Sequence, residues 1–144
     1  VACADGFIRK IDTTFFNEIA QTYAHQDGCT ALCILPSGDL LSAGKDAFIR
    51  RWSASGEKRN AFPAHLGTIY QLLALPNETY ASASRDKSIK IWSQINDQIQ
   101  QKIDLHMAGH RHSINTLLLL ENGFASAGDD KRIIVWHAQN PKSL

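Results

Sequence analysis

Three stretches of this chain repeat one pattern of small, acidic and aromatic residues. They cover residues 41–52, 81–92 and 125–136. Each has a serine at its second position, an aspartate four residues after the serine and a tryptophan six residues after the aspartate. A fixed spacing that recurs three times is typical of a repeat protein, in which every copy builds the same supersecondary unit. The chain therefore has to fold as a row of similar units.

A histidine precedes each of these stretches at a nearly constant distance. His25, His65 and His110 lie 21, 21 and 20 residues before the aspartate of their own copy. The tryptophans that end the three copies follow one another at intervals of 40 and 44 residues. Four residue types thus recur in one register along most of the chain.

This histidine-to-tryptophan pattern resembles the WD40 family, whose repeats of ~40–45 residues each form one four-stranded blade of a β-propeller. The aspartate that the family has after each tryptophan is replaced by Ser53, Ser93 and His137. The resemblance implies an all-β, WD40-type β-propeller with three recognisable four-stranded blades. An N-terminal blade remnant would precede them, and the ring would be incomplete.

The histidines and turns set the expected boundaries within this partial propeller. We expect a blade remnant over residues 1–24, blades over 25–64 and 65–109, and a last blade over 110–144 that lacks its outer strand. Residues 1–5 align with residues 42–46, so the chain opens inside a repeat and we expect further sequence upstream. That sequence, or another chain, would supply the remaining blades.

Apolar runs between turn residues predict the strands. Central strands are expected over residues 29–35, 69–75 and 114–120, and the longest apolar run, residues 117–120, is expected to be buried. Residues 93–106 fit either a short helix or an outer strand. We expect the strand, because a fourth strand is due there.

The resemblance also assigns a structural role to the repeated polar residues. In the family the aspartate accepts a hydrogen bond from the histidine ring, the histidine contacts the serine, and the serine accepts from the tryptophan indole N–H. The sets implied here are His25, Ser42, Asp46 and Trp52; His65, Ser82, Asp86 and Trp92; and His110, Ser126, Asp130 and Trp136.

Serine, histidine and aspartate together also invite a hydrolytic interpretation. A catalytic triad needs one exposed nucleophile in a pocket with an oxyanion hole, whereas three equivalent sets recur here at blade spacing. We therefore expect no catalytic residues and no enzymatic activity.

Two clusters invite a metal-site interpretation. His106, His110 and His112 lie close in sequence, but His110 is assigned to its aspartate and no cysteine is near. Cys29 and Cys33 would lie ~13 Å apart along one strand at about 3.3 Å per residue, which is too far to share one ion. We expect neither a metal nor a cofactor.

Partner binding is expected on the narrower top face of the propeller, where partners of the family often dock. The positions that usually face it are the residue before the aspartate and those three and five after the histidine. They are Gly28, Thr30, Lys45, Thr68, Tyr70, Arg85, Ser113, Asn115 and Asp129.

Tyr70 and Arg85 are the strongest candidates, because tyrosine and arginine are enriched at interface hot spots. Lys45 and Arg85, on adjacent blades, favour an acidic or phosphorylated peptide. The alternative for any one of these residues is a solvated rim.

The overall charge narrows the class of partner. Fifteen Lys and Arg against fourteen Asp and Glu leave a formal net charge of +1, which gives no global attraction to nucleic acid or to an anionic membrane. RNA binding through Lys45, Arg85, Arg111 and Lys131 is a third possibility, and a steep loss of affinity with salt would mark it. No apolar run approaches the ~18 residues that span a bilayer.

Three cysteines without a disulfide framework favour a reducing compartment, so we predict a cytoplasmic, intracellular protein; a nuclear location is also compatible. We predict a non-enzymatic scaffold that binds protein or peptide partners, as part of a multiprotein complex. The alternative is a regulatory propeller domain of a larger enzyme, a kinase or an NTPase, whose catalytic part lies upstream.

Two charged residues do not fit the repeat. Arg51 and Lys10 stand where Ile91 and Val135 stand in other copies, directly before the tryptophan or its substitute. They either extend to an edge with buried stems or face a carboxylate from outside this chain.

Overall fold

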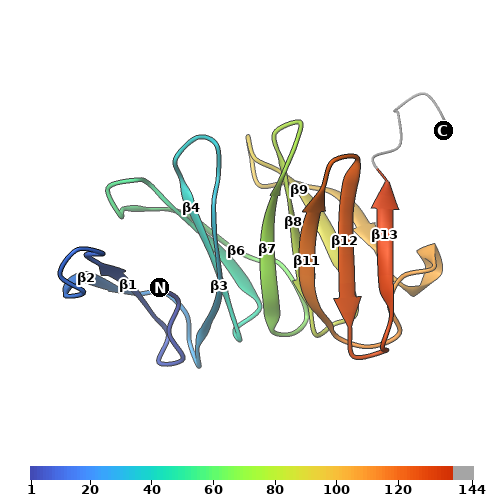
Figure 1. The fold of residues 1–144 in the computed structure, drawn as a ribbon, viewed down its shortest axis with the longest axis horizontal. Helices are drawn as coiled ribbons and strands as arrows, with labels where there is room; N and C mark the ends of the chain where they lie inside the picture. Colours follow the sequence, from blue (N-terminus) through green and yellow to red (C-terminus); the bar gives the residue numbers. More distant parts are fainter. Residues whose placement is uncertain (138–144) are drawn as a thin grey trace.

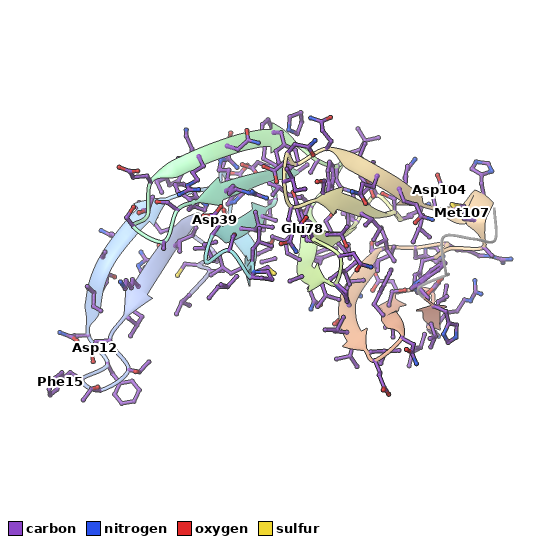
Figure 2. All side chains as sticks on the ribbon, turned by 90° about the horizontal axis from the view of Figure 1, so that it is seen from above. Asp12, Phe15, Asp39, Glu78, Asp104 and Met107 are labelled. Carbon is purple, nitrogen blue, oxygen red and sulfur yellow. The ribbon has the colours of Figure 1, made fainter. Side chains whose placement is uncertain are left out.

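A computed structural model describes residues 1–137 of the chain. These residues form antiparallel β-sheets that stand side by side, with one short 3-10 turn as their other regular element (Figure 1). Seen from above, the sheets fan out along an open arc, with Asp12 and Phe15 at one tip and Met107 towards the opposite side (Figure 2). The expected all-β architecture of propeller blades is confirmed.

In each sheet, strands that are consecutive in sequence are hydrogen-bonded neighbours. The remnant sheet consists of β1 (Phe7–Ile11) and β2 (Glu18–Tyr23). The first blade consists of β3 (Cys29–Ile34), β4 (Leu40–Gly44), β5 (Phe48–Trp52) and β6 (Lys58–Pro63). The second blade consists of β7 (Ile69–Leu75), β8 (Thr79–Ser84), β9 (Ile89–Ser93) and β10 (Ile99–Ile103). The third blade consists of β11 (Ile114–Leu120), β12 (Gly123–Gly128) and β13 (Ile133–His137).

The segment between β9 and the third blade contains a strand, not an α-helix. Its outer strand β10 is followed by a 3-10 turn over Leu105–Met107, which Asp104 caps by accepting from the backbone N–H of His106. The end of the expected last blade, residues 138–144, lies outside the described residues.

The hydrophobic core lies between blades. Ile49 of the first blade and Ile69 and Trp92 of the second share one buried cluster. Ile89 of the second blade and Leu117 of the third share another. Because each blade buries one face against its neighbour, the blades stabilise one another along the arc.

The expectation that residues 117–120 are buried is wrong for three of the four leucines. Leu117 is 3% exposed, but Leu118 is 63% exposed, and Leu119 and Leu120 are also solvent-accessible. Side chains alternate between the faces of a strand. Leu118 and Leu120 share the face that no described blade covers, whereas Leu119 lies on the face of Leu117 but is only partly covered by the second blade.

Candidate partner-binding surface and the hydrogen-bond sets beneath it

The four residues of each implied structural set lie within hydrogen-bonding distance. In the first blade, His25 Nδ1 is 2.9 Å from Asp46 Oδ1 and His25 Nε2 is 2.8 Å from Ser42 Oγ. The Trp52 indole N–H donates to the same serine oxygen at 2.8 Å. The set therefore joins β4, β5 and the loop before β3.

The other two blades repeat this arrangement. Nδ1 of the histidine is 2.9 Å from Asp86 in the second blade and 2.8 Å from Asp130 in the third. Nε2 is 2.6 Å from Ser82 and 2.8 Å from Ser126. Each serine also accepts from its tryptophan indole at 2.8 Å.

The three serines are saturated and inaccessible. An aspartate partner fixes the proton on Nδ1 of each histidine, so Nε2 accepts the serine hydroxyl proton while the serine oxygen accepts from the indole. Ser42 and Ser82 are fully buried and Ser126 is 1% exposed. Because nucleophilic catalysis needs a hydroxyl that a substrate can reach, this geometry makes the sets structural.

Burial and hydrogen bonding shift the pKa values within the sets. Burial lowers the pKa of His25 and of His65, and the aspartate partner of each only partly offsets it. Burial alone would raise the pKa of Asp130, but the backbone N–H groups of Arg111 and Arg132 and the ring of His110 lower it to about 2. These shifts favour neutral imidazoles at His25 and His65 and an ionised carboxylate at Asp130.

Each full blade adds its own groups around this common set, and the repeat pattern does not predict them. In the first blade, Arg50 Nη1 lies 2.8 Å from Asp46 Oδ2 and 2.7 Å from His25 Nδ1. In the second, the Ser88 hydroxyl donates to Asp86 Oδ1 at 2.6 Å. Both additions bring a further donor to the aspartate.

Three of the expected top-face residues are bulge residues. The pairing of β3 with β4 passes from Cys29 to Ala31 and skips Thr30. The pairings of β7 with β8 and of β11 with β12 skip Tyr70 and Asn115 in the same way. Because a β-bulge redirects the side chain of its extra residue, this irregularity presents one residue per blade at the same end of the sheets.

The remaining expected residues lie beside these bulges. The backbone N–H of Lys45 donates to Gly28 O at 3.0 Å, that of Arg85 to Thr68 O at 2.8 Å, and that of Asp129 to Ser113 O at 2.9 Å. These bonds bring the two loops at the top of each blade together. The exposed members are Lys45, Tyr70, Arg85, Asn115 and Asp129.

Several of these residues are engaged within the protein. The Thr30 hydroxyl donates to Ala43 O at 3.2 Å and contacts Ile69 O of the next blade. Asn115 Nδ2 donates to Asp129 Oδ1 at 2.5 Å. Gly28 is buried, and Asn115 and Asp129 are bonded to each other. The top-face residues that remain available to a partner are therefore mainly the exposed ones of the first and second blades.

Sequence reasoning missed Leu66, which follows the histidine of the second blade. Its side chain is 96% exposed and lines an open groove between the first and second blades. We call this the inter-blade groove; it is lined by Lys45, Leu66, Gly67, Thr68, Arg85 and Asp86. A single leucine after a polar residue carries no periodic signal. Only its position directly after the histidine of the repeat could have indicated that Leu66 lies at this surface.

Arg51 faces a carboxylate from within this chain. Its Nη2 is 2.6 Å from Asp97 Oδ1, and its Nη1 donates to Gln94 O at 2.8 Å. Tyr80 and Asn60 also donate to Asp97, at 3.0 and 2.9 Å. Arg51 therefore joins the first blade to the β9–β10 loop of the second, whereas Lys10 is exposed.

Within residues 1–137, no group of three or more His, Cys, Asp or Glu side chains is arranged to hold a metal ion. In this part of the chain there is also no helix with the length and apolar character needed to cross a bilayer.

The WD domain, G-beta repeat family model matches residues 16–53 and 56–93. Together with the blades and the recurring polar sets, this match shows that the chain belongs to the WD40 repeat family.

Two curated relatives are similar over most of the chain. Mitochondrial division protein 1 of Eremothecium gossypii is 31% identical over 135 residues, which is 84% of this chain and 18% of that protein. Ribosome biogenesis protein YTM1 of Podospora anserina is 27% identical over 115 residues, which is 72% of this chain and 24% of that protein. The chain thus spans about a fifth of the length of these relatives.

Proposed function

We propose that this chain is a non-catalytic scaffold that binds a protein or peptide partner on its top surface, within a multiprotein complex. The observation that carries the proposal is the contrast between two layers. The polar groups of the repeated sets are saturated beneath the surface, whereas Tyr70, Arg85 and Lys45 stand exposed above them. Rigid sheets that hold exposed loops are well suited to presenting a binding surface.

Membership in the WD40 family supports the scaffold role. Exposed tyrosine and arginine support a binding centre at Tyr70 and Arg85, because these residue types dominate interface hot spots. The two cations, Lys45 and Arg85, support an acidic partner. The free cysteines of the described chain support a site of action inside the cell.

A peptide-display selection tests the proposal. The immobilised chain is used to select random displayed peptides, and the enriched peptides are then titrated against the Tyr70→Ala/Arg85→Ala variant. We expect the selected peptides to bind this variant at least about tenfold more weakly, the loss typical of hot-spot residues. The thermal midpoint should hardly change, because both side chains are exposed.

The matched control is Lys58→Ala/Gln100→Ala, which removes two exposed side chains from the outer strands β6 and β10. This control should bind the selected peptides as the wild type does. Peptides that bind the wild type and the Tyr70→Ala/Arg85→Ala variant equally would contradict the top surface as the binding face, and so would a selection that enriches nothing.

A further inference from the structure

The inter-blade groove combines an apolar side chain and two cations in one place. Leu66 lies on the loop that leads into the second blade, Lys45 on the β4–β5 turn and Arg85 on the β8–β9 turn. We infer that this groove binds an acidic peptide segment that carries an apolar side chain between its carboxylates. The inference rests on the proposed top-surface function and specifies its ligand.

The backbone of Leu66 is fixed although its side chain is free. Its N–H donates to Asp86 Oδ2 at 3.1 Å, and the preceding His65 ring is bonded to Asp86 and Ser82. A 96% exposed leucine on an anchored backbone has no role in the described core. It needs little further ordering of its backbone to bury apolar surface against a ligand.

The two cations are also held by their surroundings. The N–H of Lys45 is bonded to Gly28 O, and that of Arg85 to Thr68 O. A Cβ built on Gly28 would stand 3.4 Å from Lys45 Cε, so the lysine stem packs along this glycine. Among residues 1–137, neither cation takes part in an ion pair.

The carboxylate in the groove is already engaged. Asp86 accepts from His65 Nδ1 at 2.9 Å, from the Ser88 hydroxyl at 2.6 Å and from the N–H groups of Leu66 and Ser88. Because its lone pairs are satisfied by the blade itself, Asp86 leaves the two exposed cations without a partner. A ligand with carboxylates complements them.

The repeat provides internal comparisons for this groove. Between the remnant sheet and the first blade, the positions of Lys45, Leu66 and Arg85 are held by Ala4, Gln26 and Lys45. Between the second and third blades they are held by Arg85, Arg111 and Asp129. Of these three junctions, only the one between the first and second blades places an apolar residue between two cations.

The groove chemistry favours a peptide over RNA. Proteins that bind single-stranded RNA stack its bases on aromatic side chains, and none of the six groove residues is aromatic. The exposed leucine instead suits an aliphatic side chain. The carboxylates of the ligand would flank this side chain and meet Lys45 and Arg85.

The test uses a fluorescein-labelled synthetic peptide with one leucine between runs of Asp and Glu, titrated by fluorescence anisotropy. We expect a Kd tighter than about 100 µM at about 50 mM salt. Lys45→Ala should weaken binding about fivefold, and Leu66→Ser about tenfold. Replacing the peptide acids by their amides, or its leucine by serine, should weaken binding to a similar extent.

Two variants serve as matched controls. Arg111→Ala removes a top-face cation outside the groove, and Ile95→Ser replaces another exposed apolar residue in the β9–β10 loop. Both should bind like the wild type, and all four variants should melt at nearly the wild-type temperature. No binding, or an equal loss with Arg111→Ala, would overturn the inference, as would tighter binding of a phosphoserine peptide or of oligouridine.

The outcome is separable from that of the scaffold proposal, because Lys45 and Leu66 are not among the residues changed in the display experiment. Displayed peptides that require Tyr70 and Arg85, together with no binding of the acidic peptide, would leave the scaffold in place and refute the groove. Failure of both experiments would refute both.

Discussion

The two complete junctions between blades use the same repeat in different ways. Between the first and second blades, the position before the tryptophan holds Arg51, whose charge is paired with Asp97 across the junction. Between the second and third blades, the same position holds Ile91, which belongs to an apolar cluster. The first junction thus adds a buried ion pair to its apolar cluster, whereas the second has apolar packing at this position. We call the first the polar junction and the second the apolar junction. The blade fold accepts both, provided that every buried charge has its partner.

The largest expected effect comes from the tryptophans that face these junctions. Trp92 is 5% exposed and lies 5.2 Å from the Phe62 ring of the first blade, whereas Trp136 is only half-buried. Trp92→Ala should cost about 3–5 kcal/mol of unfolding free energy, and Trp136→Ala clearly less, because less apolar surface and fewer neighbours are lost. Urea unfolding measures both, and equal losses would contradict the difference between the junctions.

The polar junction should be the more sensitive to loss of one partner. Asp97→Asn keeps the size of the side chain and tolerates its φ of 56°, but it leaves the buried Arg51 charge with only the more distant carboxylate of Asp39, 3.8 Å away. We expect a loss of about 3 kcal/mol. Ile91→Val, the matched change at the apolar junction, should cost about 1 kcal/mol.

A double variant sharpens this comparison. Arg51→Ile/Asp97→Asn gives the first junction the residue that the second one has at that position. Because no unpaired charge is left behind, it should recover most of the stability that Asp97→Asn loses in urea unfolding. A double variant as unstable as Asp97→Asn alone would show that the ion pair itself is not the reason for the loss.

A smaller effect is expected at the apolar junction, where one polar side chain joins the two blades. Gln71 Nε2 donates to Leu117 O at 2.9 Å, and Gln71 Oε1 accepts from Leu117 N at 2.8 Å. Gln71→Ala leaves both backbone groups without this partner and should cost about 1–3 kcal/mol. Gln101→Ala, an exposed glutamine on β10, is the control and should change the urea midpoint little.

These contacts mark the boundary of what the sequence could predict. The blades and the polar sets can be predicted from the sequence, because the repeat fixes the spacing of residues within each copy. The members of one set follow from that spacing. The Arg51–Asp97 pair joins residues 46 positions apart and needs a left-handed loop residue, so no local pattern indicates it. The exposure of Leu118 depends on which face has a neighbouring blade, a property that composition does not contain.

The smallest expected effect is a loss of stability in mild acid. Burial lowers the pKa of His25 and His65 in the folded chain, so the unfolded chain binds more protons just below the ordinary histidine pKa of about 6.5. Stability is therefore fully present above that pH and falls as the pH drops through the folded-state values. The lowered pKa values of Asp86 and Asp130 act in the same direction, but only below about pH 3.8.

Urea midpoints between about pH 7 and pH 5 measure this effect where the carboxylates still keep their charge. His65→Gln removes one of the two imidazoles whose pKa burial lowers, so its stability should depend less steeply on pH than that of the wild type, although it is less stable throughout. The exposed His106→Gln is the control, because its imidazole lies outside the three sets. If His65→Gln kept the full pH dependence, the titrating group would have to lie outside the second blade's set, and the polar junction would not be the acid-sensitive one.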